Sequence, residues 1–575
     1  MDTAFSQLLN FASRGRLFAY PEQKPGFQPP TQFWYGPTAH DTEHDDIERG
    51  LEDAFDGIDV DEKRRNQDPN PLDSSDGAVD SSDNALQTSD TSIVNNKESL
   101  EKDGAEELCV GWYGPDDPEN PQNWTSLKKA FIAGQVLTLT FSVYVGSSIY
   151  TPALPEIMEH FHISQTAALV PLSVFVFGYG IGPIVFSPLS EHPAVGRMWI
   201  YVITLLIFVC LQVPTALSPN IGSLIILRFL GGVFSSPALA TSGATFGDIY
   251  ALAYIPFALA LWAISAICGP VFGPVLGGVF AQVLGWRWTF WMLLWISGAC
   301  LGILFFFFPE TSSANILYRR ARRLEKLTGK KYTTTARQEW ATKKMSTVAY
   351  DILLRPILIT FTEPVVFALG LYIALLYSTL YSWFEAFPIV FTELHDFNTI
   401  QSGLAYLGLI VGGFVGVGLY LPIIYTKFTR PVLQGNFPPV SMFMKLCLIG
   451  STIFPASLFF FAWTSHKSIH WIVPIVASGI CIIGMVFIFQ TVFNYLSGSY
   501  PKYIASVFAG NGLFRAFVAG GFPLFAHQMF VKLGPSKFPV GWGTTLVGCI
   551  GVLMGLIPLV LIKWGDKLKG SSRWA

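Results

Sequence analysis

Charged residues are scarce in this chain of 575 residues, at 13% of the composition, whereas hydrophobic residues make up 51% and phenylalanine alone occurs 48 times. A soluble surface carries roughly 25–35% charged residues, so a series of soluble domains is excluded. Long uncharged stretches recur along the chain, each near the roughly 20 residues that cross a bilayer as a helix. The composition therefore predicts a membrane protein with many spans.

Motifs for chemistry are missing as well. The sequence has no P-loop, no nucleophile elbow, no HExxH and no dinucleotide fingerprint. Its seven cysteines are scattered and form no CxxC pair, which argues against a metal site and against a disulfide framework. We expect no enzyme, no cofactor and no metal, and neither nucleotide nor nucleic acid as a partner. No cleavable signal peptide is expected either, because no continuous apolar core precedes about residue 129.

Acidic residues are concentrated at the start of the chain. The first 125 positions hold 27 acidic and 9 basic residues, which leaves 13 acidic and 28 basic residues for the remainder. Residues 36 to about 105 are rich in Asp, Ser, Asn and Gly, and such a segment cannot bury enough surface to offset its ordering entropy. We predict an acidic, largely disordered tail over residues 1–126.

Twelve apolar segments follow the tail in two sets of six. They lie near residues 129–150, 166–187, 198–217, 221–247, 254–281 and 287–308, and near 358–391, 401–425, 441–464, 471–498, 504–530 and 543–563. The sequence therefore predicts an all-α polytopic membrane protein. Its parts are a six-helix half over 127–309, a basic loop over 310–356, a second six-helix half over 357–565 and a short tail over 566–575.

The basic residues predict an orientation. With an even number of spans both termini share one face, and that face collects 22 of the 28 basic residues of the body, against 4 on the other. Basic residues favour the cytosolic side. Both termini and the central loop are therefore expected in the cytosol, where the loop would face anionic lipid.

Four ionisable residues inside apolar segments are candidates for function, because a charge within a bilayer is costly unless it faces protein or water. Arg228 and Asp248 lie in the fourth segment, Glu385 in the seventh and Arg515 in the eleventh. Structural roles stay open: backbone carbonyls could satisfy Arg228, and Asp248 could be a helix-end charge. We expect the Arg515 side chain to snorkel to the cytosolic interface, with burial as the alternative.

Glu385 is the acid placed most deeply in the second half, with Tyr377, Tyr381, Trp383 and Phe384 around it. Apolar surroundings favour the protonated carboxyl, so this group could take up and release a proton if it opened to each side in turn. The alternative is a structural glutamate whose carboxyl bonds to the nearby tyrosine hydroxyls.

The fifth segment contains the most specific string, GPVFGPVLGG over residues 269–278. Gly269, Gly273 and Gly277 recur every four residues on one helix face, which lets another helix approach closely. Pro270 and Pro274 remove two backbone donors and bend the helix at the same level. We predict a tight, bent contact that forms the hinge or seal of a moving bundle.

One face of the tenth segment combines aromatic and amide side chains at three- and four-residue spacing. Such a face suits large apolar ligands that carry one or two polar groups, and core packing is the alternative. We predict a substrate cavity built from this face and from segments seven and eleven. Its candidate residues are Tyr377, Tyr381, Phe384, Phe489, Gln490, Phe493, Asn494 and Phe514.

These strings resemble the major facilitator superfamily, and within it the twelve-span drug:proton antiporters of fungi. The run Gly269-x3-Gly273-Pro274-x2-Gly277-Gly278 is similar to the antiporter motif on the fifth helix, and Arg228-Phe229-x-Gly231-Gly232 is similar to the fourth-helix motif. Further strings of the fungal type are DDPENPQNW, WRWTFW and PET (309–311). The likeness runs from about residue 110 to 565 and is to yeast exporters for benomyl, methotrexate and fluconazole.

The loop between segments two and three departs from the pattern of that superfamily. It reads GPIVFSPLSEHPAVGR, where Glu191 stands for the usual Asp and Gly196-Arg197 for the later Gly-Arg pair, while the adjacent Arg is missing. The resemblance implies that this loop forms a cytosolic gate with the end of the fourth helix, pairing Arg197 with Asp248.

The resemblance implies two six-helix halves that rock about a midplane cavity, with Arg228 in proton coupling and Asp248 and Glu385 as candidate proton carriers. It implies a monomeric, proton-coupled multidrug efflux transporter for varied hydrophobic or cationic compounds such as azoles. The plasma membrane is favoured over the vacuolar membrane. The alternatives are a dedicated proton-coupled carrier of a physiological solute, such as a polyamine, a vitamin or an endogenous toxin, and a non-transporting membrane receptor.

Overall fold

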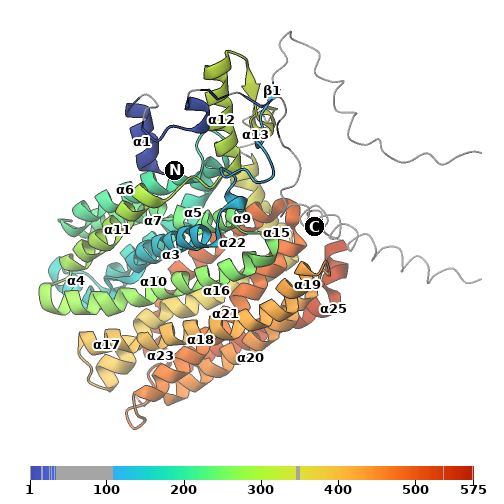
Figure 1. Ribbon diagram of the computed structural model, residues 1–575. Helices are drawn as coiled ribbons and strands as arrows, with labels where there is room; N and C mark the ends of the chain where they lie inside the picture. The colour runs from blue at the N-terminus through green and yellow to red at the C-terminus, as the bar shows by residue number, and fades with distance from the viewer. Residues whose placement is uncertain are drawn as a thin grey trace, which may run out of the picture.

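The computed structural model describes residues 2–13, 17–24, 26, 27, 29, 30, 33, 108–342, 344, 347, 350–534, 537–570, 572 and 574 of the chain. Within these residues, twelve helical spans are long and apolar enough to cross a membrane. They form two bundles of six, coloured cyan to green and yellow to red in Figure 1. The predicted all-α membrane fold with two six-helix halves is confirmed.

The spans keep close to their predicted limits. In the first half they are α3 (Ser126–Ser148), α5 (Gln165–Glu191), α6 (Arg197–Ala216), α7 (Ile221–Ser235) with α8 (Pro237–Ala240) and α9 (Ser242–Ile249), α10 (Ile255–Leu284) and α11 (Arg287–Phe307). In the second half they are α16 (Pro364–Phe387), α17 (Thr399–Ala405) with α18 (Leu407–Ile424), α20 (Ser441–Thr464), α21 (Ile472–Ser499), α22 (Ile504–Gly521) with α23 (Pro523–Leu533), and α24 (Gly541–Met554) with α25 (Ile557–Gly570).

The seventh span begins later than the predicted segment 358–391. Residues Arg355–Thr362 form a separate helix, α15, and α16 starts at Pro364. A residue before proline is pushed out of the α conformation, and Glu363 accordingly has an extended backbone with φ −93° and ψ 109°. The apolar run therefore divides at Glu363, a break that hydropathy alone does not detect.

The two halves repeat one packing scheme. In the first half α3 packs on α10, α5 on α7, and α6 on α11, which pairs span one with five, two with four and three with six. In the second half α16 packs on α22, α18 on α21, and α20 on α24, the same pairs shifted by six. Between the halves, α5 (span two) packs on α22 (span eleven), and α10 (span five) packs on α18 (span eight). A shift of six spans converts one of these contacts into the other, so the interface has the same internal symmetry. Internal repeats of this kind place a binding site near the midplane between the halves.

The bundle has two distinct faces. One face carries both ends of the described chain together with α12 (Ser313–Thr328) and α15, and we call it the terminal face. The other carries α4 (Leu154–Phe161) and α17, at the left and lower left of Figure 1, and we call it the opposite face.

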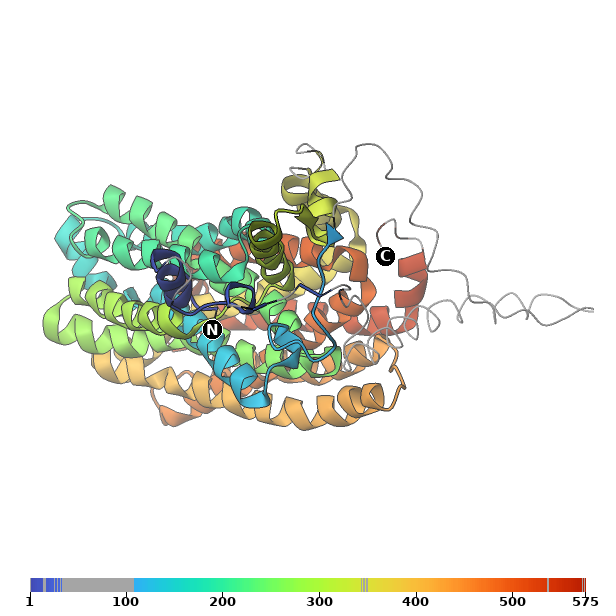
Figure 2. The same cartoon turned by 45° about the horizontal axis from the view of Figure 1, so that its top comes forward.

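Both ends of the acidic tail fold onto the terminal face. Helix α1 (Ala4–Ala12) contacts α11, and strand β1 (Leu108–Cys109) pairs in parallel with β2 (Tyr332–Thr333), which follows α12. Figure 2 shows the blue strand β1 close to the olive helix α12, whereas the dark blue helix α1 lies farther along the same face. The disorder predicted for residues 36 to about 105 lies outside the described residues. The folded ends were not foreseen, because elements far along the chain, α6, α11, α12 and β2, supply their contacts.

Arginines of α12 meet carboxylates of the tail. Arg320 pairs with Asp117 and Glu119 at 2.7 Å each, Arg323 pairs with Glu22 at 2.9 Å, and Arg319 pairs with Asp2. We call these residues the tail clasp. Because Arg320 is fully buried, its charge depends on these partners for compensation.

Acid should release the tail clasp. Burial raises the pKa values of Glu22 and Asp117, but bonds to Arg323 and Arg320 outweigh it, so both pKa values lie below their ordinary range. A carboxyl whose pKa is lowered by folding adds stability above its ordinary pKa and loses it as the pH falls through the folded value. We expect the protection of backbone amides 108–124 against hydrogen exchange, measured relative to the intrinsic rate at each pH, to fall as the pH falls below about 4.

The substitutions Glu22→Gln and Asp117→Asn together mimic this protonation, and they should raise the same exchange at pH 7. Asp396→Asn is the matched control, because it removes only an exposed pair with Lys467 at 3.5 Å. Unchanged exchange in the double variant would contradict a role of the clasp in holding the tail.

Candidate functional site

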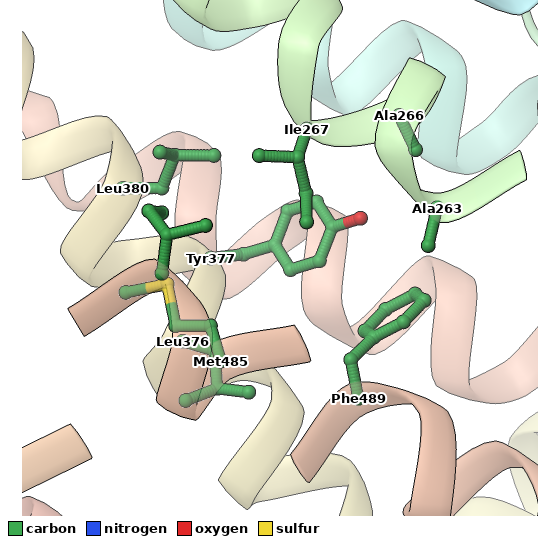
Figure 3. Close-up of a pocket in the computed structure, with 9 residues that line it drawn as sticks. Ala263, Ala266, Ile267, Leu376, Tyr377, Leu380, Met485 and Phe489 are labelled. Carbon is green, nitrogen blue, oxygen red and sulfur yellow. The ribbon is translucent and has the colours of Figure 1, made fainter. Parts of the chain in front are cut away.

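A small cavity of about 30 Å³ lies between the two halves, where α10 faces α16 and α21. Its lining is almost entirely apolar and comes from three helices. The residues are Ala263, Ala266 and Ile267 of α10, Leu376, Tyr377 and Leu380 of α16, and Ile482, Met485 and Phe489 of α21. Figure 3 shows the ring of Tyr377 in the middle of this group, between Ile267 and Phe489. We call this space the central cavity.

Contacts between the halves occur on both sides of the central cavity. Toward the opposite face, the Ile400 backbone N–H donates to Oε1 of Gln282 at 3.1 Å. Toward the terminal face, Oγ1 of Thr429 donates to the carbonyl of Ala253 at 3.0 Å. The two halves therefore contact each other on both sides of the central cavity.

Arg515 of α22 is buried beside the central cavity. Its guanidinium carbon lies 4.4 Å from the ring centroid of Tyr377 and 5.7 Å from that of Phe489, both of which line the cavity. Tyr144 of α3 and Tyr179 of α5 also interact electrostatically with this charge. The expectation that Arg515 snorkels is wrong. The start of α22 is eleven residues away, roughly 16 Å along a helix, which exceeds the reach of the side chain.

Arg228 of α7 is buried within the first half. Its Nη1 donates to the carbonyl of Gly146 at 2.6 Å and its Nη2 to the carbonyl of Ser147 at 3.0 Å, both near the end of α3. The guanidinium carbon lies 4.3 Å from the ring centroid of Phe175. Backbone carbonyls thus satisfy both terminal nitrogens of Arg228, as in the structural alternative, while its Nε has no partner in the described residues and its role in coupling stays a prediction.

Glu385 lies near the opposite face, farther from the middle of the bundle than its place in the apolar segment suggested. Its Oε2 accepts a hydrogen bond from Nε2 of Gln165 at 2.7 Å and lies 3.5 Å from Nδ1 of His527. The alternative in which tyrosine hydroxyls bond to this carboxyl is therefore wrong, because Tyr381 faces Tyr179 and Ser147 instead. Gln165 and His527 belong to α5 and α23, so this carboxyl joins three spans and both halves.

Asp248 and Arg197 form the ion pair that the resemblance implied. The Arg197 guanidinium donates to both carboxylate oxygens of Asp248, and Oγ1 of Thr311 lies 3.4 Å from the same carboxylate. Glu191 also interacts electrostatically with Arg197. The pair ties the start of α6 to the end of α9 at the terminal face.

Glu310 lies beside the Arg197–Asp248 pair at the terminal face. The sequence indicated this residue only through the PET string. Its carboxylate accepts hydrogen bonds from the backbone N–H groups of Arg197 at 3.0 Å, Met198 at 3.3 Å and Ser312 at 2.9 Å. The first two of these bonds cap the start of α6. Gly196 precedes the cap with φ +76°, and a Cβ there would overlap Oε2 of Glu310. The gate loop is therefore fixed by backbone geometry as well as by charge.

The glycine face of α10 packs against α3. A Cβ on Gly269 would overlap Tyr144, one on Gly273 would overlap Ser148, and one on Gly277 would overlap the carbonyl oxygen of Ile149. Gly278 faces Thr399 of α17 across the two halves. This string thus lies both in the packing of the first half and in the closed opposite face.

The prolines of α10 complete that contact. Pro274 has no N–H for the carbonyl of Pro270, four residues earlier, and Oγ of Ser148 donates to that carbonyl instead at 2.5 Å. A backbone acceptor freed by proline is therefore used to join α3 to α10.

Of the residues predicted for the cavity, Tyr377 and Phe489 line it. The others pack nearby or face away. Tyr381 and Phe384 pack on each other, Phe493 packs on Phe489, Gln490 donates to the carbonyl of Leu259, Asn494 donates to the hydroxyl of Tyr420, and Phe514 packs on Phe361 and Phe367. The small and aliphatic lining residues were missed, because nothing local distinguishes them from core.

Comparisons with known proteins agree with this arrangement. Residues 136–523 match the profile of the Major Facilitator Superfamily. The chain is 45% identical to "Transporter mfs1" of Schizosaccharomyces pombe, covering 81% of this chain and 88% of the relative. It is 43% identical to the "Cycloheximide resistance protein" of Candida maltosa, covering 84% and 90%. It is 42% identical to "Fluconazole resistance protein 1" of Saccharomyces cerevisiae, covering 81% and 84%.

A solved structure has a similar fold at low identity. The crystal structure of a D-xylose-proton symporter superposes with a TM-score of 0.52 at 17% identity, covering 76% of this chain and 97% of that chain. At this identity the likeness concerns the fold alone.

Proposed function

The chain belongs to the Major Facilitator Superfamily, and we propose that it is a proton-coupled exporter of chemically varied, mostly apolar drugs, antifungal azoles among them. The observation that carries the proposal is the apolar central cavity between two symmetry-related halves. Relatives that are 42–43% identical and named for cycloheximide and fluconazole resistance support the substrate class. Transporters of this family are not enzymes, and the proposed substrates are small molecules.

In this proposal the terminal face is cytosolic and the protein is a monomer in the plasma membrane. The tail over 1–126, the central loop over 310–356 and the end at 566–575 then lie on the cytosolic side. The excess of basic residues on that face supports the orientation. The opposite face, with Glu385 and His527, would meet the outside of the cell.

Export would proceed by rocking of the two halves around the central cavity. In the outward state Glu385 loses its partners Gln165 and His527 and takes up a proton as the drug leaves. The Arg197–Asp248 pair breaks when the cytosolic side opens, and Arg228 holds the end of α3 throughout. One pH unit is equivalent to about 1.36 kcal/mol per proton, roughly a tenfold drug gradient.

The accumulation of labelled fluconazole in a pump-deleted yeast that expresses the chain tests the proposal. We expect lower accumulation than in cells without the protein, and we expect a protonophore to abolish the difference. A fluorescent dye measured in parallel tests the breadth of the substrate range. Unchanged accumulation of both compounds, with the protein confirmed at the surface, would instead favour a dedicated carrier of a physiological solute.

Glu385→Gln should remove the pH dependence of efflux and lower its rate by about tenfold or more at acid external pH, because the amide cannot exchange a proton. Efflux is measured at external pH 5 and 7 at matched surface levels. Glu159→Gln is the control, since it makes the same change on an exposed residue of α4 at the opposite face. Wild-type, pH-dependent efflux in Glu385→Gln would remove Glu385 from the mechanism.

A further inference from the structure

We propose that Arg515 is the recognition group of the central cavity, that it binds a hydrogen-bond acceptor or an anionic group of the substrate, and that it makes the site reject permanent cations. The inference rests on the proposed export function and narrows its substrate class. The favoured ligands are aromatic compounds that are uncharged or anionic and carry an exposed acceptor atom.

The first argument is that Arg515 has buried hydrogen-bond donors without partners. Arg515 is only 7% exposed, yet neither its Nε nor its Nη1 has a hydrogen-bond partner in the described part of the chain. One turn earlier on the same helix, the fully buried amide of Asn511 also has neither its nitrogen nor its oxygen paired. Buried polar groups are nearly always satisfied, so unpaired donors of this kind point to a ligand that completes them.

The position of these donors gives the second argument. The Arg515 guanidinium stacks on Tyr377 and Phe489, which are the two aromatic residues that line the cavity. A ligand that binds between the halves against these two rings would therefore lie next to residues that contact the guanidinium. Arg228 offers the contrast, because two backbone carbonyls accept from both of its terminal nitrogens and only its Nε is unpaired.

The third argument is the absence of a compensating acid. None of the nine residues that line the cavity is acidic. Of the buried acids predicted to carry protons, Glu385 is engaged by Gln165 and His527, and Asp248 by Arg197. Aromatic ring faces often bind ligand cations, but here Arg515 already lies over one face of Tyr377 and one face of Phe489. A cationic ligand would therefore meet an uncompensated positive charge, which opposes the expected export of cationic compounds.

Export measurements with matched ligands test the proposal. In cells with wild-type protein, efflux of labelled fluconazole is challenged with 2-naphthoate and with 2-naphthylmethylammonium, which share one ring system and differ in charge. We expect the carboxylate to compete at a concentration at least about tenfold lower than the ammonium. Equal or stronger competition by the ammonium would overturn the proposal without changing any residue.

Substitution at the site gives the second test. Arg515→Gln keeps a donor and removes the charge, and it should abolish the preference for the carboxylate, whereas Arg515→Lys should retain it. Arg430→Gln, which neutralises an exposed arginine at the terminal face, should behave as wild type. If Arg515→Gln reaches the surface and keeps the tenfold preference, Arg515 is not the recognition group. If wild-type cells export no fluconazole, the proposed function fails instead.

Discussion

Replacement of Arg228 by alanine is expected to abolish drug efflux. The change removes two charge-assisted hydrogen bonds to the carbonyls of Gly146 and Ser147 and leaves both acceptors buried without donors. It also opens a void beside Phe175, where the guanidinium now stacks. Hydrogen bonds to charged groups contribute roughly 1.5–3 kcal/mol each, so a fall in efflux of about a hundredfold is expected.

Arg228→Lys separates charge from geometry. Lysine keeps the charge, but its compact ammonium cannot bridge two carbonyls while stacking on a ring, so we expect only partial efflux. Arg287→Ala is the control, since Arg287 is a half-buried arginine of the same half that stacks on Trp286 at 4.5 Å. Efflux and protein at the cell surface are measured together. Wild-type, pH-dependent efflux in Arg228→Ala would show that this cation is dispensable.

Gly277→Ala is expected to cause the second large loss. The added methyl group would overlap the carbonyl oxygen of Ile149, and a backbone atom cannot turn aside as a flexible side chain does. Overpacking of this kind destabilises a folded structure by roughly 1–3 kcal/mol. The strain would lie at the contact between α10 and α3, which we expect to move during transport. We expect efflux per surface molecule to fall by about tenfold or more.

Gly302→Ala is the matched control for this prediction. Gly302 lies in the neighbouring span α11, and a Cβ there would meet no atom within 4 Å. The same addition should therefore leave efflux near the wild-type level. Equal efflux in Gly277→Ala and wild type would mean that the close approach of α3 and α10 is not required for transport.

The spans were predictable because hydropathy is summed over about twenty residues and tolerates local exceptions. The segment predicted at 441–464 is Ser441–Thr464, and the one at 287–308 is Arg287–Phe307. The start of the seventh span was predicted wrongly, because Pro364 and the preceding Glu363, rather than hydropathy, set the boundary. The glycine face was predictable for a related reason, since a four-residue period is local to one helix.

Partners across spans could not be predicted in the same way. Glu385 was recognisable as a buried acid, but Gln165 and His527 lie 220 residues before it and 142 residues after it. Tyr144 and Tyr179 approach Arg515 only because spans one and two of the first half meet spans seven and eleven of the second. Such contacts depend on which faces pack together, and a single sequence does not contain that information.

Because of the tail clasp, removal of the N-terminal tail would also remove carboxylates that pair with arginines of α12. A chain beginning at residue 105 would keep Asp117 and Glu119 for Arg320, but it would lose Asp2 and Glu22 and leave Arg319 and Arg323 without those carboxylates. A trimmed variant is therefore a charge mutant of α12 as well as a tail deletion. A trimming experiment on the tail would need Arg319→Gln and Arg323→Gln in the same background to tell the two effects apart.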